Sequence, residues 1–130
     1  MLIKIVFLAS LLAISLGKSA PPITCNSAGA CLASDCCEFI DTFCDAVDPE
    51  NLPLHDSNSR CYNLSNGNRC DFMAFNTYKT NWSPSGTNCK TVLRNVTSQC
   101  SFGGHGKITN ADPAYTFVVD VNAGPCNINI

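Results

Sequence analysis

Apolar side chains recur at two spacings along this chain, and the two spacings predict helices in some segments and strands in others. Over residues 34–47 apolar positions return every three or four residues while the carboxylates fall on the opposite side, which predicts a helix that starts at Ser34 and is capped by its hydroxyl. The same spacing over residues 87–99 predicts a second helix, packed beside the first. Over residues 115–122 apolar and polar residues alternate, which predicts a strand with one buried face.

A hairpin is predicted between the two helices. Residues 60–65 and 68–78 have strand character, and Asn66 and Gly67 between them tolerate the positive φ of a tight turn. Neither face of the second strand is cleanly polar, which predicts a central strand. Residues 48–59 and 79–88 are predicted loops, residues 102–106 a flexible glycine-rich segment, and residues 107–109 a short strand. The fold class is therefore α+β, a small disulfide-rich α/β sandwich with two helices on a mainly antiparallel sheet.

The chain opens with the pattern of a secretory signal peptide. Lys4 precedes an apolar run over residues 5–16, and small residues follow up to Ser19. A buried helix is the alternative, but Pro21 and Pro22 end the run. We expect a signal peptide over residues 1–19 and a single domain over residues 20–130, secreted to the extracellular space.

All ten cysteines follow this leader, and their even number predicts about five disulfides in an oxidising compartment. The spacing leaves their pairing open and does not match a zinc site, so neither a metal nor another cofactor is expected. The predicted disulfide residues are Cys25, Cys31, Cys36, Cys37, Cys44, Cys61, Cys70, Cys89, Cys100 and Cys126.

Charge gives no sign of a polyanionic partner. The full chain has 8 Lys and Arg against 10 Asp and Glu, and removing Lys4 and Lys18 with the leader leaves six against ten. Without a basic patch, nucleic acid and insertion into an anionic membrane are not expected.

The cysteine pattern resembles a known family of secreted fungal proteins. Cys25-Asn-Ser-Ala-Gly-Ala-Cys31, the pairs Cys61/Cys70 and Cys89/Cys100, and Thr116-Phe-Val-Val-Asp-Val-Asn with Cys126 resemble the virally encoded killer toxins of smut fungi. Length and overall sequence are more similar still to the glycan-binding lectin family found in the shaggy ink cap mushroom. The resemblance implies an α/β sandwich with every cysteine paired, and Cys36, Cys37 and Cys44 depart from the toxin pattern.

Two clusters of residues offer the chemistry of a sugar site, in which an aromatic ring stacks on a pyranose beside hydrogen-bonding groups. The first is the loop with Tyr78, Asn81 and Trp82. The second comprises His105, Asn110, Asp112 and Tyr115. The alternative for Trp82 and Tyr115 is that they belong to the core.

We therefore predict a lectin that binds cell-surface glycans or glycoproteins bearing N-acetylhexosamine or fucose, serves in defence and is toxic to target cells. The alternative is a killer-toxin-like protein acting on a membrane channel or on the growth of competing fungi. No catalytic motif accompanies His55 or His105, so no enzyme is predicted. A homodimer is compatible with the sequence and would add avidity. Three sequons, at Asn63, Asn81 and Asn95, predict a glycoprotein, although Pro84 weakens the second.

Overall fold

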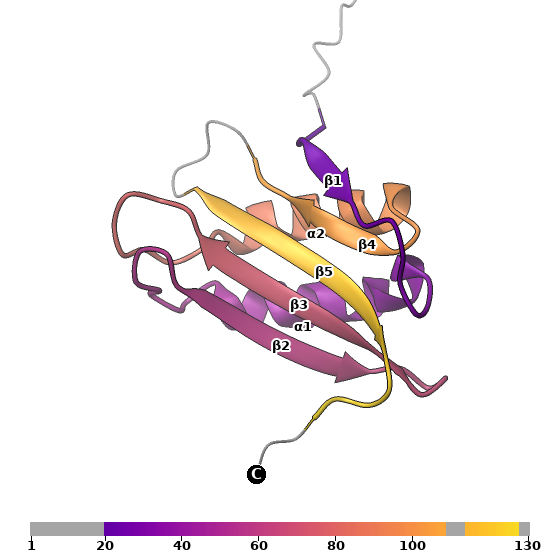
Figure 1. The fold of residues 1–130 in the computed structure, drawn as a ribbon. Coiled ribbons are helices and arrows are strands. Elements are labelled where there is room, and N and C mark those ends of the chain that lie inside the picture. Colours follow the sequence, from indigo (N-terminus) through magenta and orange to yellow (C-terminus); the bar gives the residue numbers. More distant parts are fainter. Residues whose placement is uncertain (1–19, 109–113, 128–130) are drawn as a thin grey trace, which may run out of the picture.

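The protein is a two-layer α+β sandwich in the computed structural model, which describes residues 20–108 and 114–127 (Figure 1). One layer is a five-stranded antiparallel sheet in the order β1-β4-β5-β3-β2. Its strands are β1 Ile23–Cys25, β2 Ser57–Asn63, β3 Asn68–Asn76, β4 Gly103–Gly106 and β5 Tyr115–Ala123. The other layer is a 3-10 helix, η1 Ala33–Phe39, followed by α1 Ile40–Val47 and α2 Gly86–Gln99.

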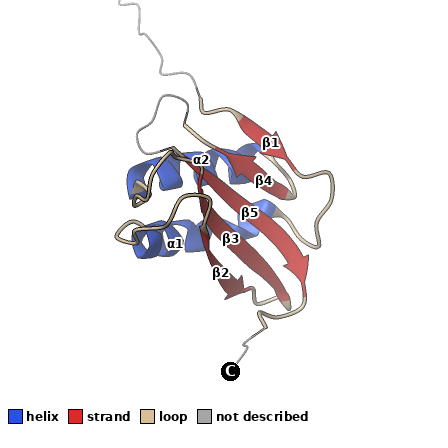
Figure 2. Ribbon diagram, turned by 60° about the vertical axis from the view of Figure 1, so that its left-hand side comes forward, coloured by secondary structure: helices blue, strands red, loops and turns tan. Residues whose placement is uncertain are grey.

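Figure 2 shows both α-helices on the same face of the sheet, which confirms the predicted fold class. We refer to the opposite face, which no described helix covers, as the open face. The predicted leader over residues 1–19 lies outside the described residues.

A single core lies between the helices and the sheet. The apolar residues of β5 alternate as the sequence predicted, and Phe117 and Val119 are at most 1% exposed. Phe43 of α1 stacks on Phe72 of β3 with 5.2 Å between ring centroids. The buried apolar side chains of α2 complete the core; they are Val92, Leu93 and Val96. Since the strands alternate, every second residue of β3 and β5 projects onto the open face instead.

The two helices are also joined through their polar groups. Asp48, just after α1, accepts a hydrogen bond from the backbone N–H of Gly86 at 2.6 Å, which places a carboxylate at the positive end of α2. Ser85 caps the same end by accepting from the Asn88 N–H. The predicted packing of the second helix beside the first is confirmed.

The hairpin of β2 and β3 is confirmed, with one correction to its turn. Gly67 has φ +84°, whereas Asn66 does not have positive φ. Instead, the Asn66 side chain accepts a hydrogen bond from the Asn68 N–H at 3.0 Å. β3 pairs with β2 on one side and β5 on the other, so it is central, as predicted.

The predicted cap of the first helix is wrong. The first helical segment begins as a 3-10 helix capped by Leu32 without a side-chain hydrogen bond, so Ser34 is not its cap. The entry into η1 is set by tertiary structure, because the N–H of buried Ala33 donates to the Ser101 carbonyl at 2.8 Å.

The glycine-rich segment is a strand rather than a flexible stretch, and Lys107 and Ile108 beyond it are not in a strand. β4 runs between β1 and β5 in such close contact that side chains would not fit at its glycine positions. A Cβ on Gly103 would approach the Val119 carbonyl oxygen to 2.3 Å, and one on Gly104 the Thr24 carbonyl oxygen to 2.1 Å. The glycines therefore allow close strand pairing here.

The structure contains four disulfides, one fewer than predicted, and two of them join the helical layer to the sheet. The four disulfides join Cys25 to Cys100, Cys36 to Cys70, Cys44 to Cys89 and Cys61 to Cys126. Cys31 and Cys37 carry free thiols, which corrects the expectation that all ten cysteines pair. Cys37 lies on the surface with its sulfur 3.3 Å from the Thr97 hydroxyl oxygen, while Cys31 is half-buried. An even number of cysteines does not by itself place the last two, Cys31 and Cys37, close enough to form a disulfide.

We expect DTNB to titrate two thiols per chain in guanidinium without reductant. In the folded protein at pH 8, Cys37 should react first, because burial and the nearby Asp35 carboxylate raise the pKa of the Cys31 thiol and lower its thiolate fraction. Alkylation followed by peptide mapping identifies the reacting residue. Absence of any thiol would instead support the fifth bridge expected from the sequence.

Candidate functional site

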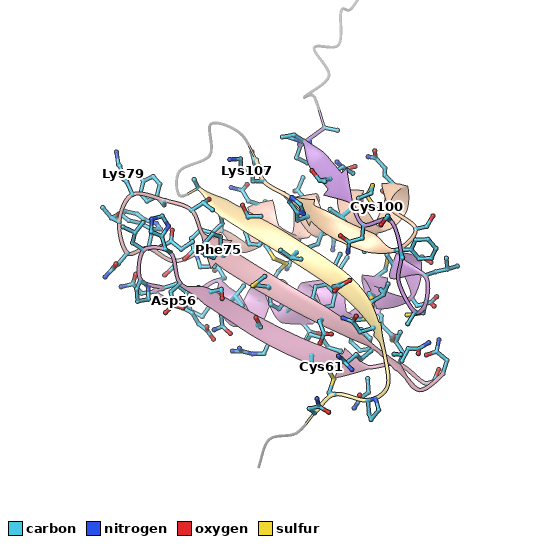
Figure 3. All side chains as sticks on the ribbon, viewed as in Figure 1. Asp56, Cys61, Phe75, Lys79, Cys100 and Lys107 are labelled. Carbon is cyan, nitrogen blue, oxygen red and sulfur yellow. A yellow bond between two sulfur atoms is a disulfide. The ribbon has the colours of Figure 1, made fainter. Side chains whose placement is uncertain are left out.

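The loop between β3 and α2 presents the most exposed aromatic side chain of the described residues. Trp82 is 52% exposed, so it does not fill the end of the core. The Tyr78 ring meets the indole edge to face at 6.2 Å between centroids, and the Lys79 ammonium lies 5.5 Å from the Tyr78 centroid. Asn81 is exposed beside Trp82. The structure thus brings together the first predicted cluster, at the end of the sheet where Figure 3 labels Lys79.

The backbone of this loop is fixed by a buried asparagine. Asn76, 0% exposed at the end of β3, donates through its amide nitrogen to the carbonyl oxygens of Leu52, Pro53 and Thr80 at 3.0–3.2 Å. Its side-chain oxygen accepts from the Tyr78 N–H at 2.8 Å. One side chain therefore joins two loops that are far apart in sequence, and a buried amide so fully bonded holds them rigidly.

Trp82 is held through its backbone while its indole ring stays accessible. Its N–H and carbonyl form a two-bond bridge with Leu52, at 3.1 and 3.0 Å. The Tyr115 hydroxyl donates to the Trp82 carbonyl oxygen at 2.6 Å. The neighbouring Asn81 side-chain oxygen accepts from the Leu54 N–H at 3.1 Å. The loop is thus organised before any ligand arrives, which lowers the entropy cost of binding.

The second predicted cluster does not form as expected. Tyr115 is 3% exposed and stacks on Phe117, so it belongs to the core, the alternative that the sequence left open. His105 is exposed on β4, where it pairs with Val118 on the open face, on the opposite side of the sheet from Tyr115. Asn110 and Asp112 lie outside the described residues.

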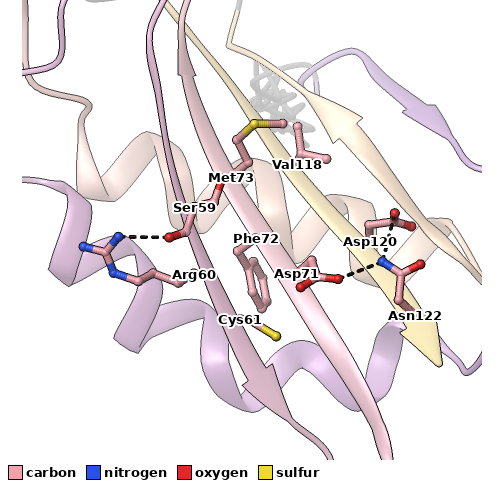
Figure 4. Close-up of a pocket in the computed structure, with 9 residues that line it drawn as sticks. All are labelled: Ser59, Arg60, Cys61, Asp71, Phe72, Met73, Val118, Asp120 and Asn122. Carbon is pink, nitrogen blue, oxygen red and sulfur yellow. Dashed lines mark hydrogen bonds between the residues drawn. The ribbon is translucent and has the colours of Figure 1, made fainter. Parts of the chain in front are cut away.

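A hollow on the open face is a site that the sequence reasoning missed. A cavity of about 420 Å³ lies over β2, β3 and β5 (Figure 4). Met73 and Val118 face each other across the strands, and Asp71 pairs in register with Asp120 beside them. The signal was present in the sequence, because the outward positions of β3 and β5 mix apolar with carboxylate and amide side chains.

The polar end of this hollow is a hydrogen-bonded network. The Asn122 amide nitrogen donates to Asp71 Oδ2 at 2.8 Å and to Asp120 Oδ2 at 3.2 Å. Arg69 Nε donates to Asp71 Oδ2 at 2.9 Å, and Asn26 Nδ2 donates to Asp120 Oδ1 at 3.1 Å. The two carboxylates can therefore lie on adjacent strands because donors separate them.

The three sequon asparagines differ in the freedom of the nitrogen that would carry a glycan. Asn63 and Asn81 are exposed and use only their side-chain oxygens, toward the N–H groups of Cys126 and Leu54. Asn95 is half-buried on α2, and its Nδ2 donates to the Pro21 carbonyl at 3.3 Å.

Neither a membrane span nor a metal cluster emerges from the described part of the chain. Within residues 20–108 and 114–127, no helix is long and apolar enough to cross a bilayer. The same residues contain no group of three His, Cys, Asp or Glu side chains that could hold a metal ion.

This sandwich, with an ordered aromatic loop and a hollowed open face, has the features of a carbohydrate-binding domain. Residues 35–126 match the family model described as glycan binding domain Y3, and the chain belongs to that family. It is 44% identical over 97 residues to the antiviral protein CAP of Coprinus comatus, covering 72% of this chain and 93% of that protein.

Replacing Tyr115 with phenylalanine should weaken stability at neutral pH by about 1 kcal/mol, because the hydroxyl bond to Trp82 is lost. Burial raises the pKa of Tyr115 to about 12, above its unfolded value near 10. The native state keeps this proton longer, so stability is full below about pH 10 and falls as pH rises toward 12. Urea titrations from pH 9 to 12 should show a shallower alkaline loss in Tyr115→Phe. An unchanged slope would place the ionisation elsewhere.

Proposed function

We propose that this protein is a secreted lectin that binds cell-surface glycans bearing terminal N-acetylhexosamine or fucose, and that it serves in defence and is toxic to target cells. Membership of a glycan-binding family supports a binding role rather than an enzymatic one. The name of the Coprinus comatus relative, an antiviral protein, supports a role in defence. The disulfides fit an oxidising, extracellular location.

The observation that carries the proposed site is that Trp82 is 52% exposed on a backbone held by three hydrogen bonds. A pyranose has a face of C–H groups that packs on an indole ring. Because a tryptophan side chain has only two rotatable bonds, holding it in place on binding costs little conformational entropy. Tyr78 adds a second ring, inclined at 75° to the indole, and the Asn81 amide nitrogen remains a donor for sugar oxygens. We assign Tyr78, Asn81 and Trp82 to the sugar platform, a name we keep for these three residues.

Trp82→Ala should weaken binding of the free monosaccharides N-acetylglucosamine, N-acetylgalactosamine and fucose at least about tenfold, because the stacking surface is lost. The stability change should stay within about 1 kcal/mol, since the indole is half exposed and its backbone bonds remain. Titrations followed by NMR measure the affinities, and calorimetry measures the midpoint.

Leu54→Ala is the matched control, because Leu54 is 41% exposed on the adjoining loop and carries no ring. Its monosaccharide affinities should match those of the unmodified protein. Equal losses in both variants, or a large fall in the Trp82→Ala midpoint, would contradict the sugar platform. No binding of any glycan by the unmodified protein would favour the killer-toxin alternative.

We further propose that the chain is a glycoprotein modified at Asn63 before the other sequons. Asn63 ends an exposed edge strand, and its Nδ2 donates to none of the described residues, whereas the Asn95 nitrogen is engaged and Pro84 follows the Asn81 sequon. Mass spectrometry before and after peptide-N-glycosidase F should show a glycan lost at Asn63 and none at Asn95. Occupancy of Asn95 alone would contradict this order.

A further inference from the structure

The open face carries a groove that extends well beyond the hollow over β2, β3 and β5. A second cavity of about 680 Å³ lies between β5 and residues 25–30, and both cavities are lined by Asp120 and Asn122. The two cavities therefore adjoin at these side chains, and we call the two together the open-face groove. Its lining includes Ser59, Asp71, Met73, Val118, Asp120 and Asn122.

The donors at the polar end of this groove are already used within the protein. Both hydrogens of the Asn122 amide point to carboxylates, Asp71 and Asp120, and this fixes the amide orientation. The Asn26 amide nitrogen is likewise engaged by Asp120 and by the Phe102 carbonyl. A ligand at this end of the groove would find few side-chain N–H groups available.

Acceptors are left over by the same network. Asp71 Oδ1 and the side-chain oxygens of Asn122 and Asn26 accept no hydrogen bond from the described residues. A surface rich in carboxylate and amide oxygens selects a partner that is rich in donors. Arg69 forms an ion pair with Asp71, but Asp120 has no cationic partner among the described residues, so the polar end of the groove keeps a negative charge that disfavours anions.

An apolar patch lies beside these acceptors. Met73 and Val118 are partly exposed and pair in register across β3 and β5. A ligand that fits must combine C–H surface with hydroxyl or amide donors and carry no negative charge. A neutral sugar has this combination, and the two adjoining cavities offer more room than one ring requires.

We propose that the open-face groove is a second glycan site, which binds a neutral oligosaccharide of at least two sugar units. The proposal rests on the lectin function but not on Trp82, which lies in the loop that follows β3. Each chain would then hold two sites of different kinds, a stacking platform for a terminal sugar and an acceptor-lined groove for an extended one.

Ser59→Arg and Ser57→Arg form a matched pair for testing the groove. Both serines are exposed on β2, and by the alternation of the strand both project on the same face, but only Ser59 lines the groove. An arginine at position 59 brings bulk and a cation toward Asp71, whereas one at position 57 lies beyond the lining residues. Neither variant removes a core contact.

The assay is a glycan array with neutral oligosaccharides and their sialylated and sulfated counterparts, read with the unmodified protein, both arginine variants and Trp82→Ala. The strongest neutral oligosaccharide on the array is then titrated by NMR against each protein. We expect Ser59→Arg to weaken the affinity for this oligosaccharide at least about tenfold, and Ser57→Arg to leave the affinity within about twofold of the unmodified protein. The backbone amide resonances of Val118, Asp120 and Asn122 should shift on titration, both in the unmodified protein and in Trp82→Ala. The sialylated and sulfated oligosaccharides should bind more weakly than their neutral counterparts.

Equal binding by the two arginine variants, or shifts confined to residues 78–82, would overturn the groove and leave the sugar platform standing. Loss of all oligosaccharide binding in Trp82→Ala would also overturn it, because the groove would then have no affinity of its own. Oligosaccharide binding that depends on Ser59 but not on Trp82 supports the groove, and the monosaccharide titrations of Trp82→Ala then decide the platform separately. Silence of the unmodified protein across the array would overturn both.

Discussion

Covalent links between the helices and the sheet are the constraint on which the rest of this structure depends. The helices cover only one face of the sheet, so the described residues pack around a single apolar interface. Cys36–Cys70 ties η1 to β3, and Cys44–Cys89 ties α1 to α2 inside that interface. Each such bridge contributes about 2–4 kcal/mol in small domains. Because stability is supplied on this side, the opposite face is free to carry polar side chains.

The periodicity of the sequence was enough to predict most elements with strong side-chain patterns. The alternation in β5 and the helical spacing in α2 survive in the structure because burial on one face imposed them. β4 escaped prediction because its glycines have no such pattern, and its strand character comes from the backbones of β1 and β5 on either side. β1 is only three residues long and was missed for a similar reason, since it exists through pairing with β4. Local sequence does not encode such pairing.

The candidate sites likewise combine residues that the sequence points to with an arrangement that only the fold determines. The sequence made Trp82 a candidate for stacking on a sugar, but its exposure depends on Asn76, which joins loops from two distant segments. The open-face network could not be seen in advance, because Asp71 and Asp120 are 49 positions apart in the sequence and meet only through strand register. Cysteine pairing was similarly hidden. The number of cysteines indicated the compartment, while the fold decided that Cys31 and Cys37 remain unpaired.

Strand β5 connects both proposed sites through the pleat of a single element. Its inward residue Tyr115 reaches through the edge of the core to hold the Trp82 carbonyl, while its outward residues Asp120 and Asn122 line the groove. Tyr115 and Asp120 are five residues apart along the strand, which is about 17 Å at the rise of an extended chain. The two faces of β5 therefore have different roles. The buried face orders the loop that contains Trp82, and the solvent face supplies hydrogen-bond acceptors to the groove. Two proposed sites held at a fixed separation by β5 can engage one branched glycan or two neighbouring ones, and their combined affinity would then exceed that of either alone.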